Sequence, residues 1–183
     1  MLSVYLTLVT DEDDKNIIIY IYEKYYSYMA NSVANELGDR RYVEDIVHNV
    51  MLTLIEIIEN IDYSDKKKLL HLCILIAKRK AIDFKRKKSN SDISIEACKD
   101  SFNIETESPE DIVINHEAYE KIKAAFDELE YIYKEVCQLR FLHSIKEKDI
   151  AKMLGVSESV VSMRIFRARQ KLAEILRRES INV

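Results

Sequence analysis

Apolar side chains recur every three or four residues along three long segments in the first half of the chain, 16–37, 41–61 and 66–88. This spacing places them on one face of an α-helix, so each segment predicts an amphipathic helix. Gly38 and the polar turn 62–65 separate the segments. The predicted buried residues are Ile18, Ile21, Tyr22, Tyr25, Met29, Val33 and Leu37 in the first helix, Val43, Val47, Val50, Leu54, Ile57 and Ile61 in the second, and Leu69, Leu70, Leu72, Cys73, Leu75, Ile76, Ala77, Ala81 and Phe84 in the third.

A segment near the C-terminus, 144–176, predicts two helices joined by a tight turn. Gly155 follows the apolar face of the first helix, at a point where the left-handed conformation open to glycine ends a helix easily. Ser157 then stands at the N-cap position of the second helix. This pattern is typical of a helix-turn-helix, whose second helix enters the major groove of DNA. The residues expected to face the first helix are Val161, Ile165, Ala168 and Leu172.

The outer side of this second helix is polar near its start and basic one turn later. Small hydroxyl side chains can approach base edges there, and arginines can reach guanine edges or phosphates. The alternative interpretation is two helices of an ordinary helical core with a solvated basic face, which would leave the coincidence of cap, turn and basic face unexplained. The candidate DNA-binding residues are Ser157, Ser159, Ser162, Met163, Arg164 and Arg167.

The composition favours an all-α protein, because two Gly, one Pro and no Trp in 183 residues leave few turn residues for hairpins. The net charge of −4 hides a strong segregation of charge. Residues 78–88 hold seven Lys or Arg against one Asp, whereas residues 89–117 hold eight acids against one Lys. A basic block on an anchored helix predicts contact with nucleic acid, and the alternative is a merely solvated helix end. Its candidate residues are Lys78, Arg79, Lys85, Arg86, Lys87 and Lys88.

The segment 89–110 is rich in Ser, Asp and Glu, lacks periodicity and contains the only proline. It therefore predicts a flexible acidic linker. The predicted architecture is all-α, with two small helical domains joined by this linker. The N-terminal domain spans 1–88, and the C-terminal domain, 111–183, carries the helix-turn-helix.

Neither a catalytic nor a metal-binding arrangement is apparent in the sequence, so we expect no enzymatic activity and no cofactor or metal. Cys73, Cys98 and Cys137 lie far apart without metal-ligand spacing, which predicts reduced thiols. The sequence shows no signal peptide and no apolar run long enough to span a bilayer. We therefore expect a cytoplasmic protein that does not insert into the membrane.

Four stretches, taken in chain order, resemble bacterial sigma factors of the sigma-70 family. Residues 44–52, Glu-Asp-Ile-Val-His-Asn-Val-Met-Leu, resemble that family's polymerase-docking helix, and residues 76–86 resemble its helix for the −10 promoter element. Residues 129–141, Leu-Glu-Tyr-Ile-Tyr-Lys-Glu-Val-Cys-Gln-Leu-Arg-Phe, resemble the lead into its closing domain. Residues 149–172 follow its closing helices. The length is similar to that of the compact extracytoplasmic-function group.

This resemblance implies a sigma factor that binds core RNA polymerase and directs promoter-specific initiation. It implies that residues of the second helix contact polymerase, that the basic helix end together with Asp83 engages the −10 element, and that the helix-turn-helix reads the −35 element. From periodicity alone, the second helix fits a protein-docking surface and a helix buried in a bundle equally well. The implied polymerase-binding residues are Asp45, His48, Asn49 and Leu52.

The sequence departs from the family pattern at several positions. Leu72 stands where the family has Trp, Arg79 where it has Asn, and Glu130 where it has Pro. A stand-alone helix-turn-helix regulator that binds duplex DNA as a dimer is the alternative function. An anti-sigma partner, which could hold the protein at the membrane, is an expectation from the family.

Overall fold

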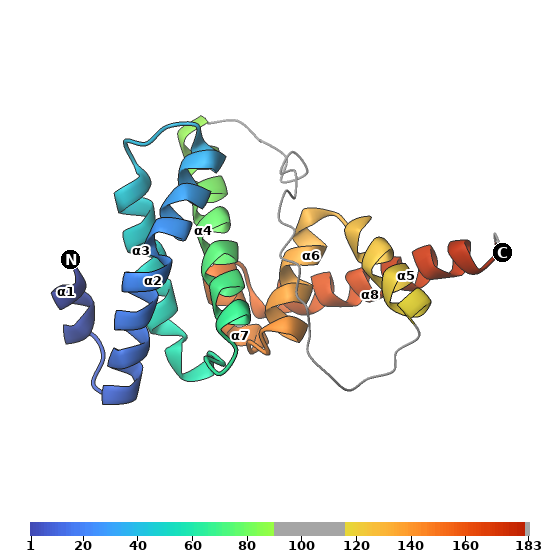
Figure 1. Ribbon diagram of the computed structural model, residues 1–183. Coiled ribbons are helices and arrows are strands. Elements are labelled where there is room, and N and C mark those ends of the chain that lie inside the picture. The colour runs from blue at the N-terminus through green and yellow to red at the C-terminus, as the bar shows by residue number, and fades with distance from the viewer. Residues whose placement is uncertain (90–115, 182–183) are drawn as a thin grey trace.

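The computed structural model describes residues 1–89 and 116–181, and within these ranges every element of regular structure is a helix. The helices form two groups, drawn in blue to green and in yellow to red in Figure 1. This arrangement confirms the predicted all-α class with two helical groups. The predicted linker lies almost entirely outside the described residues, so the domain boundaries stay predictions.

The N-terminal group is built on α2 (Glu12–Leu37), α3 (Val43–Glu56) and α4 (Lys66–Ser89), which pack side by side. Helix α2 begins four residues before the apolar pattern, because the Asp11 carboxylate accepts hydrogen bonds from the backbone N–H groups of Asp13 and Asp14. It ends at Gly38, whose φ of 66° is left-handed, as expected for a C-terminal glycine cap.

Two details of the N-terminal group differ from the prediction. The single helix expected over 41–61 ends at Glu56 and continues as a short 3₁₀ turn, η1 (Ile58–Asn60). This tighter turn keeps Ile57, Ile58 and Ile61 buried while the chain bends toward α4. The unassigned N-terminus forms a further helix, α1 (Leu2–Thr7), which packs on α2 and α3 through the fully buried Tyr5.

The C-terminal group contains α5 (His116–Asp127), α6 (Tyr131–Cys137), a π-helical turn η3 (Gln138–Leu142), α7 (Glu147–Leu154) and α8 (Glu158–Ile181). The predicted turn is confirmed: Gly155 ends α7 with a φ of 62°, and the Ser157 hydroxyl accepts a hydrogen bond from the Val160 backbone N–H at 3.4 Å. Val161, Ile165 and Ala168 are buried, and Leu172 is half-buried.

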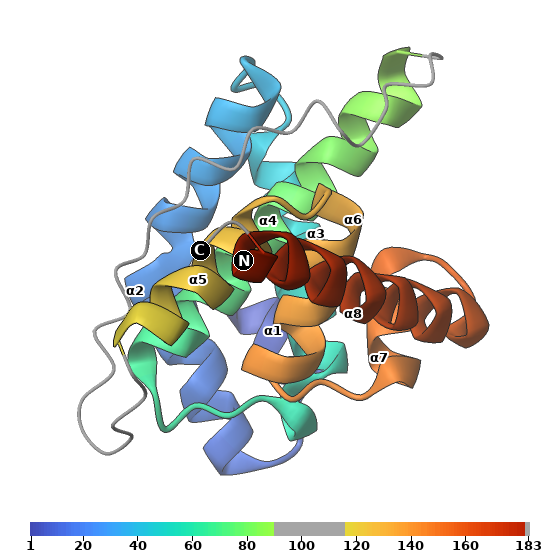
Figure 2. The same ribbon diagram turned by 90° about the vertical axis from the view of Figure 1, so that its right-hand side faces the viewer.

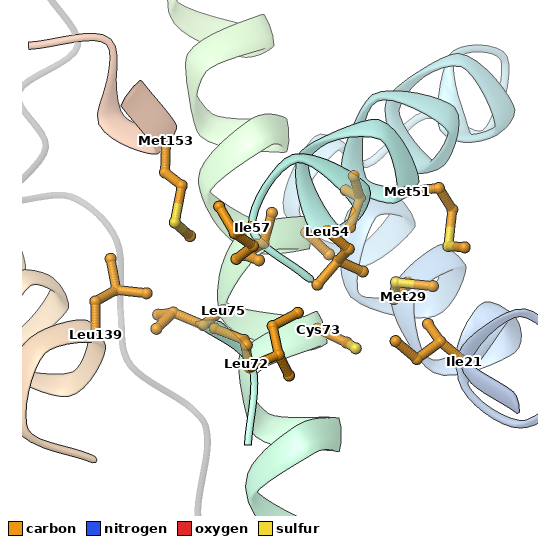
Figure 3. Packing of buried hydrophobic residues seen from close by; sticks show 14 of the residues in the cluster. Ile21, Met29, Met51, Leu54, Ile57, Leu72, Cys73, Leu75, Leu139 and Met153 are labelled. Atoms are coloured by element: carbon orange, nitrogen blue, oxygen red, sulfur yellow. The ribbon is translucent and has the colours of Figure 1, made fainter. Parts of the chain in front are cut away.

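The two groups share one continuous apolar cluster. Leu139 of η3 and Met153 of α7 lie beside Leu75 of α4 and Ile57 in the close-up of Figure 3. The helix-turn-helix is therefore packed against the N-terminal group in this structure. The described helices include none that is long and apolar enough to cross a membrane.

Candidate nucleic-acid interface

The outward face of α8 is set by the residues that α8 buries. Counting about 100° per residue from Val161, the direction opposite the buried strip falls on Ser159, Met163 and Phe166, with Arg167 on the flank. All four are exposed, and the large apolar side chains of Met163 and Phe166 are 51% and 57% exposed. We call these four residues the outward strip.

Phe166 was missed in the sequence-based site. By residue type alone, a phenylalanine in a basic helix is predicted to be buried, because Phe is among the residues most often buried. The signal that could have found it is its position seven residues, or two turns, after Ser159.

The remaining candidate residues at α8 contact other side chains of the protein or are only partly exposed. Ser157 caps the helix, and its hydroxyl lies 2.8 Å from the Ser159 hydroxyl. Ser162 is exposed, and its hydroxyl donates to the Glu147 carboxylate of α7. Arg164 is only partly exposed and its Nη1 atom is buried, so burial lowers the pKa of its guanidinium although Glu135 of α6 acts in the opposite direction. The six candidates therefore do not form one surface.

The basic end of α4 is exposed from Lys85 to Lys88, as predicted. Lys85 lies against the C-terminal part of α2, with Nζ 3.3 Å from the Glu36 carbonyl oxygen and 3.9 Å from the Glu36 carboxylate. Lys88 Nζ stands 4.4 Å from the centre of the Tyr42 ring, a cation–π distance. Both Nζ groups are thus held against the protein surface, while the two side chains remain exposed.

Arg79 does not belong to this exposed surface. It is 4% exposed, and its guanidinium donates to Asp83 at 3.0 Å and to Glu135 at 3.3 Å. Burial alone would lower the pKa of Arg79, but the carboxylates of Glu135 and Asp83 raise it above its ordinary value. Lys78 is half-buried. The predicted −10-reading residues are therefore split between the helix end and the contact with the C-terminal group.

Glu135 lies at the centre of that contact and was absent from the sequence-based site. It is 1% exposed, and burial raises the pKa of its carboxyl to about 7, although Arg79 acts in the opposite direction. In Figure 2 the helix that carries it, α6, lies between α4 and α8.

The face of α3 expected to dock on polymerase is partly covered. Asp45 and Asn49 are exposed, and the Asn49 side chain donates to the Asp45 carbonyl oxygen at 2.9 Å. His48 instead stacks on Tyr5 of α1, with Nδ1 2.9 Å from the Tyr5 hydroxyl, and Leu52 packs against the core. The short α1, with Tyr5 as its one aromatic residue, gave no sequence signal that it would cover this face.

A cleft of about 430 Å³ opens where α3, α4 and α7 meet. Lys80, Arg86 and Lys87 line it from α4, and Lys152 lines it from α7, with Asp83 as its acidic residue. It therefore presents mainly positive charge between the two helical groups.

Comparison with known proteins agrees with this geometry. The model of the family described as sigma-70, region 4 matches residues 119–172, which include α6, α7 and the first half of α8. The RNA polymerase sigma factor SigZ of Bacillus subtilis is 24% identical over 156 residues, which are 85% of this chain and 85% of SigZ. Residues 119–172 thus form a sigma-70 region 4 domain, and the chain is similar to an RNA polymerase sigma factor over most of its length.

A solved structure is also similar to this chain. It is the sigma factor RpoE in complex with the anti-sigma factor NepR from Bartonella quintana, with 16% identity and a TM-score of 0.43. The alignment covers 91% of this chain and 98% of that chain.

Proposed function

We propose that this sigma factor binds core RNA polymerase through the exposed part of α3, engages the −10 element with the end of α4, and reads the −35 element with α8. The observation that carries the proposal is the exposed outward strip of α8 within the residues that match sigma-70 region 4. The proposed role is that of a binding subunit rather than an enzyme, and it places the protein in the cytoplasm, where transcription occurs.

For the −35 element, the outward strip supplies two kinds of readout. Ser159 and Arg167 can hydrogen-bond to base edges and phosphates. Met163 and Phe166 present apolar surface, which suits the methyl groups of thymine in the major groove. We therefore propose a −35 element that contains thymines opposite these two residues.

For the −10 element, the lysines at the end of α4 neutralise phosphates of the melted strand, and Asp83 lies one turn before them. Each neutralised phosphate adds salt-dependent affinity. Capture of an unstacked base offsets the cost of opening the duplex. Binding energy, rather than covalent chemistry, thus drives strand opening.

For polymerase, the proposed contact is the exposed pair Asp45 and Asn49, which lie one helical turn apart. His48 and Leu52 join this surface if α1 moves, because Tyr5 covers His48 in the described structure. We also propose that an anti-sigma protein regulates the factor, as is usual in the family.

Co-purification with bacterial core polymerase, followed by run-off transcription on fragmented genomic DNA, tests the proposal. We expect a stable complex and start sites that share two spaced elements, the upstream one containing thymines. Asp45→Lys should weaken the complex with core, whereas Glu23→Lys, an equal charge change at an exposed site of α2, should leave it unchanged. Tight duplex binding by the protein alone, without affinity for core, would refute the proposal in favour of a stand-alone regulator.

A further inference from the structure

The cleft where α3, α4 and α7 meet gathers positive charge from both helical groups. Lys80, Arg86 and Lys87 line it from α4, and Lys152 lines it from α7. Arg86, Lys87 and Lys152 are exposed, and Lys80 is half-buried. The chain as a whole carries a net charge of −4, so a basic composition does not explain this gathering of cations. We call these four residues the cationic rim.

The carboxylates near the cationic rim are already engaged by other partners. Asp83 lines the cleft, but one of its oxygens accepts a hydrogen bond from the buried Arg79 at 3.0 Å, and the other lies 3.7 Å from Arg86 Nη2. On α7, Asp149 Oδ1 lies 3.6 Å from Lys152 Nζ. These acids therefore offset only part of the positive charge.

Two cations of the rim are left without a carboxylate. Lys80 and Lys87 lie two turns apart on one face of α4, and neither forms an ion pair within residues 1–89 and 116–181. Lys152 reaches the same cleft from α7. Like charges that share a cleft repel more strongly than in bulk water, because the protein around them is less polarisable. An anion between them would remove this repulsion.

The size and the apolar lining of the cleft suit a small molecule. Its volume of about 430 Å³ lies in the range of small-ligand sites, about 300–1,000 Å³. It is too small for a DNA duplex, whose major groove alone is about 12 Å wide. Beside the cations, the lining includes Ile46 of α3, Phe84 of α4 and Met153 and Leu154 of α7. We call these four residues the apolar wall.

We propose that this cleft binds a small-molecule anion that carries two or more phosphate groups. Lysine and arginine form short, charge-assisted hydrogen bonds to phosphate oxygens, and here they approach from two helices on separate groups. The apolar wall has room for a nucleobase, so a nucleoside triphosphate and an inorganic polyphosphate share the required chemistry. The inference goes beyond the proposed function and does not depend on it, because Lys80 and Lys152 have no part in the proposed contacts with DNA or polymerase.

Isothermal titration calorimetry of the full-length protein with ATP, GTP and inorganic tripolyphosphate tests this site. The site variants are Lys80→Gln on α4 and Lys152→Gln on α7. Their matched controls, Lys67→Gln on α4 and Lys148→Gln on α7, remove the same charge from exposed positions outside the cleft. Each site variant should weaken binding about tenfold, the effect of losing one hydrogen bond to a charged group, whereas each control should change it less than about twofold.

The three probes distinguish the two sources of the phosphate groups. Tighter binding of ATP or GTP than of tripolyphosphate would support a nucleotide whose base contacts the apolar wall. Equal binding of all three would support a site that recognises the phosphate groups alone. Circular dichroism of the five proteins should show equal helix content, so that a loss of binding in a site variant reports on the cleft and not on folding.

Four results would overturn the proposal. Absence of binding of every probe to the wild type would exclude the site, and equal weakening in site variants and controls would show unspecific charge attraction. A loss confined to Lys80→Gln would place the anion on α4 alone. If a short single-stranded oligonucleotide depended on Lys152 as strongly as tripolyphosphate does, the cleft would be a path for a nucleic-acid strand. These titrations contain no polymerase, so failure of the proposed function would show separately, in the co-purification with core polymerase.

Discussion

Helices α4 and α8 divide their basic residues in the same way. Each carries exposed cations, Lys85 to Lys88 on α4 and Arg167 on α8, and each turns one arginine inward. The inward pair, Arg79 and Arg164, approaches the same carboxylate, Glu135. The exposed cations lie at the surface, where a phosphate backbone can reach them, whereas the inward pair is buried or partly buried in the protein.

This difference shows that residue type and helix period do not by themselves assign a role to an arginine. Position 79 belongs to a basic block and position 164 to a recognition helix, yet the Arg79 side chain pairs with Glu135 across the two helical groups and the Arg164 side chain is partly buried near the same carboxylate. The roles of these two arginines depend on the helix that covers them, which is α6. The four predictions that follow separate the two classes of basic residue, from the largest expected effect to the smallest.

Arg79→Ala should have the largest effect, on stability. It leaves Glu135 buried without its ion-pair partner, and breaking a buried pair in this way costs about 3–5 kcal/mol. Lys87→Ala, at an exposed position of the same helix, should change the free energy of unfolding by less than about 0.5 kcal/mol. Urea denaturation followed by circular dichroism measures both.

A double variant sharpens this result. Arg79→Met combined with Glu135→Leu removes both charges and keeps apolar volume, so it should recover most of the lost stability. If Arg79→Ala changed the free energy of unfolding as little as Lys87→Ala does, the inward-facing Arg79 would not stabilise the protein.

Arg167→Ala and Arg164→Ala should differ in how they change promoter recognition by the holoenzyme. Loss of a base-reading arginine costs about 1–3 kcal/mol and relaxes preference at the contacted base pair. We expect this for Arg167→Ala. Arg164 lies on the flank of α8 near α6, so Arg164→Ala should weaken binding to all −35 sequences alike. Affinities for duplexes mutated singly across the −35 element measure both effects, and relaxed preference in Arg164→Ala would reverse the assignment.

Much of the fold followed from local signals in the sequence. The apolar stripes of α2, α3 and α4 were predicted because a helix of three or more turns repeats its period often enough to be read. Gly38, Gly155 and Ser157 gave the helix ends, because left-handed caps and hydroxyl N-caps have specific residue preferences. The end of α3 at Glu56 was not predicted, because the apolar residues Ile57, Ile58 and Ile61 fit a continued α-helix and a 3₁₀ turn equally well.

The candidate site was less predictable, because it depends on contacts between segments far apart in the sequence. Glu135 lies within residues 129–141, which resemble the lead into the family's closing domain. No local sequence pattern indicates that a glutamate is buried. Tyr5 covers His48 across 43 residues of sequence. Only Phe166 could have been found beforehand, by extending the helical wheel of α8 to its second turn.

Lys87→Ala should have a smaller effect on DNA binding than either arginine of α8. An exposed lysine that contacts one phosphate of a single strand contributes about 0.7 to the slope of log affinity against log salt. For the holoenzyme carrying Lys87→Ala, the slope of log affinity against log salt on a single strand with the −10 sequence should therefore be shallower by up to that amount. Its base preference should not change. A slope equal to that of the wild type would remove Lys87 from the interface.

The smallest effect concerns pH, because two buried groups act in opposite directions. Burial raises the pKa of Glu135 to about 7 from 4.5, so the folded protein holds a proton that the unfolded chain releases. Acidification from about pH 7 to 4.5 therefore favours the folded protein through Glu135. The charged or titratable groups facing it are Arg79, Asp83, Tyr131 and Arg164.

His143 has the reverse sign. Burial, with His71 and Lys68 nearby, lowers the pKa of His143 to about 3 from 6.5, so the unfolded chain takes up a proton that the folded protein does not bind. Acidification from about pH 6.5 to 3 therefore favours unfolding through His143. The two contributions overlap between about pH 6.5 and 4.5 and should largely cancel there.

Single substitutions should expose each contribution, with the urea midpoint measured across this range of pH. Glu135→Gln leaves only the histidine contribution, so its stability should fall steadily below about pH 6.5. His143→Gln leaves only the carboxyl contribution, so its stability should rise from about pH 7 to 4.5. If both variants followed the wild-type profile, these two groups would not titrate differently in the folded and the unfolded protein.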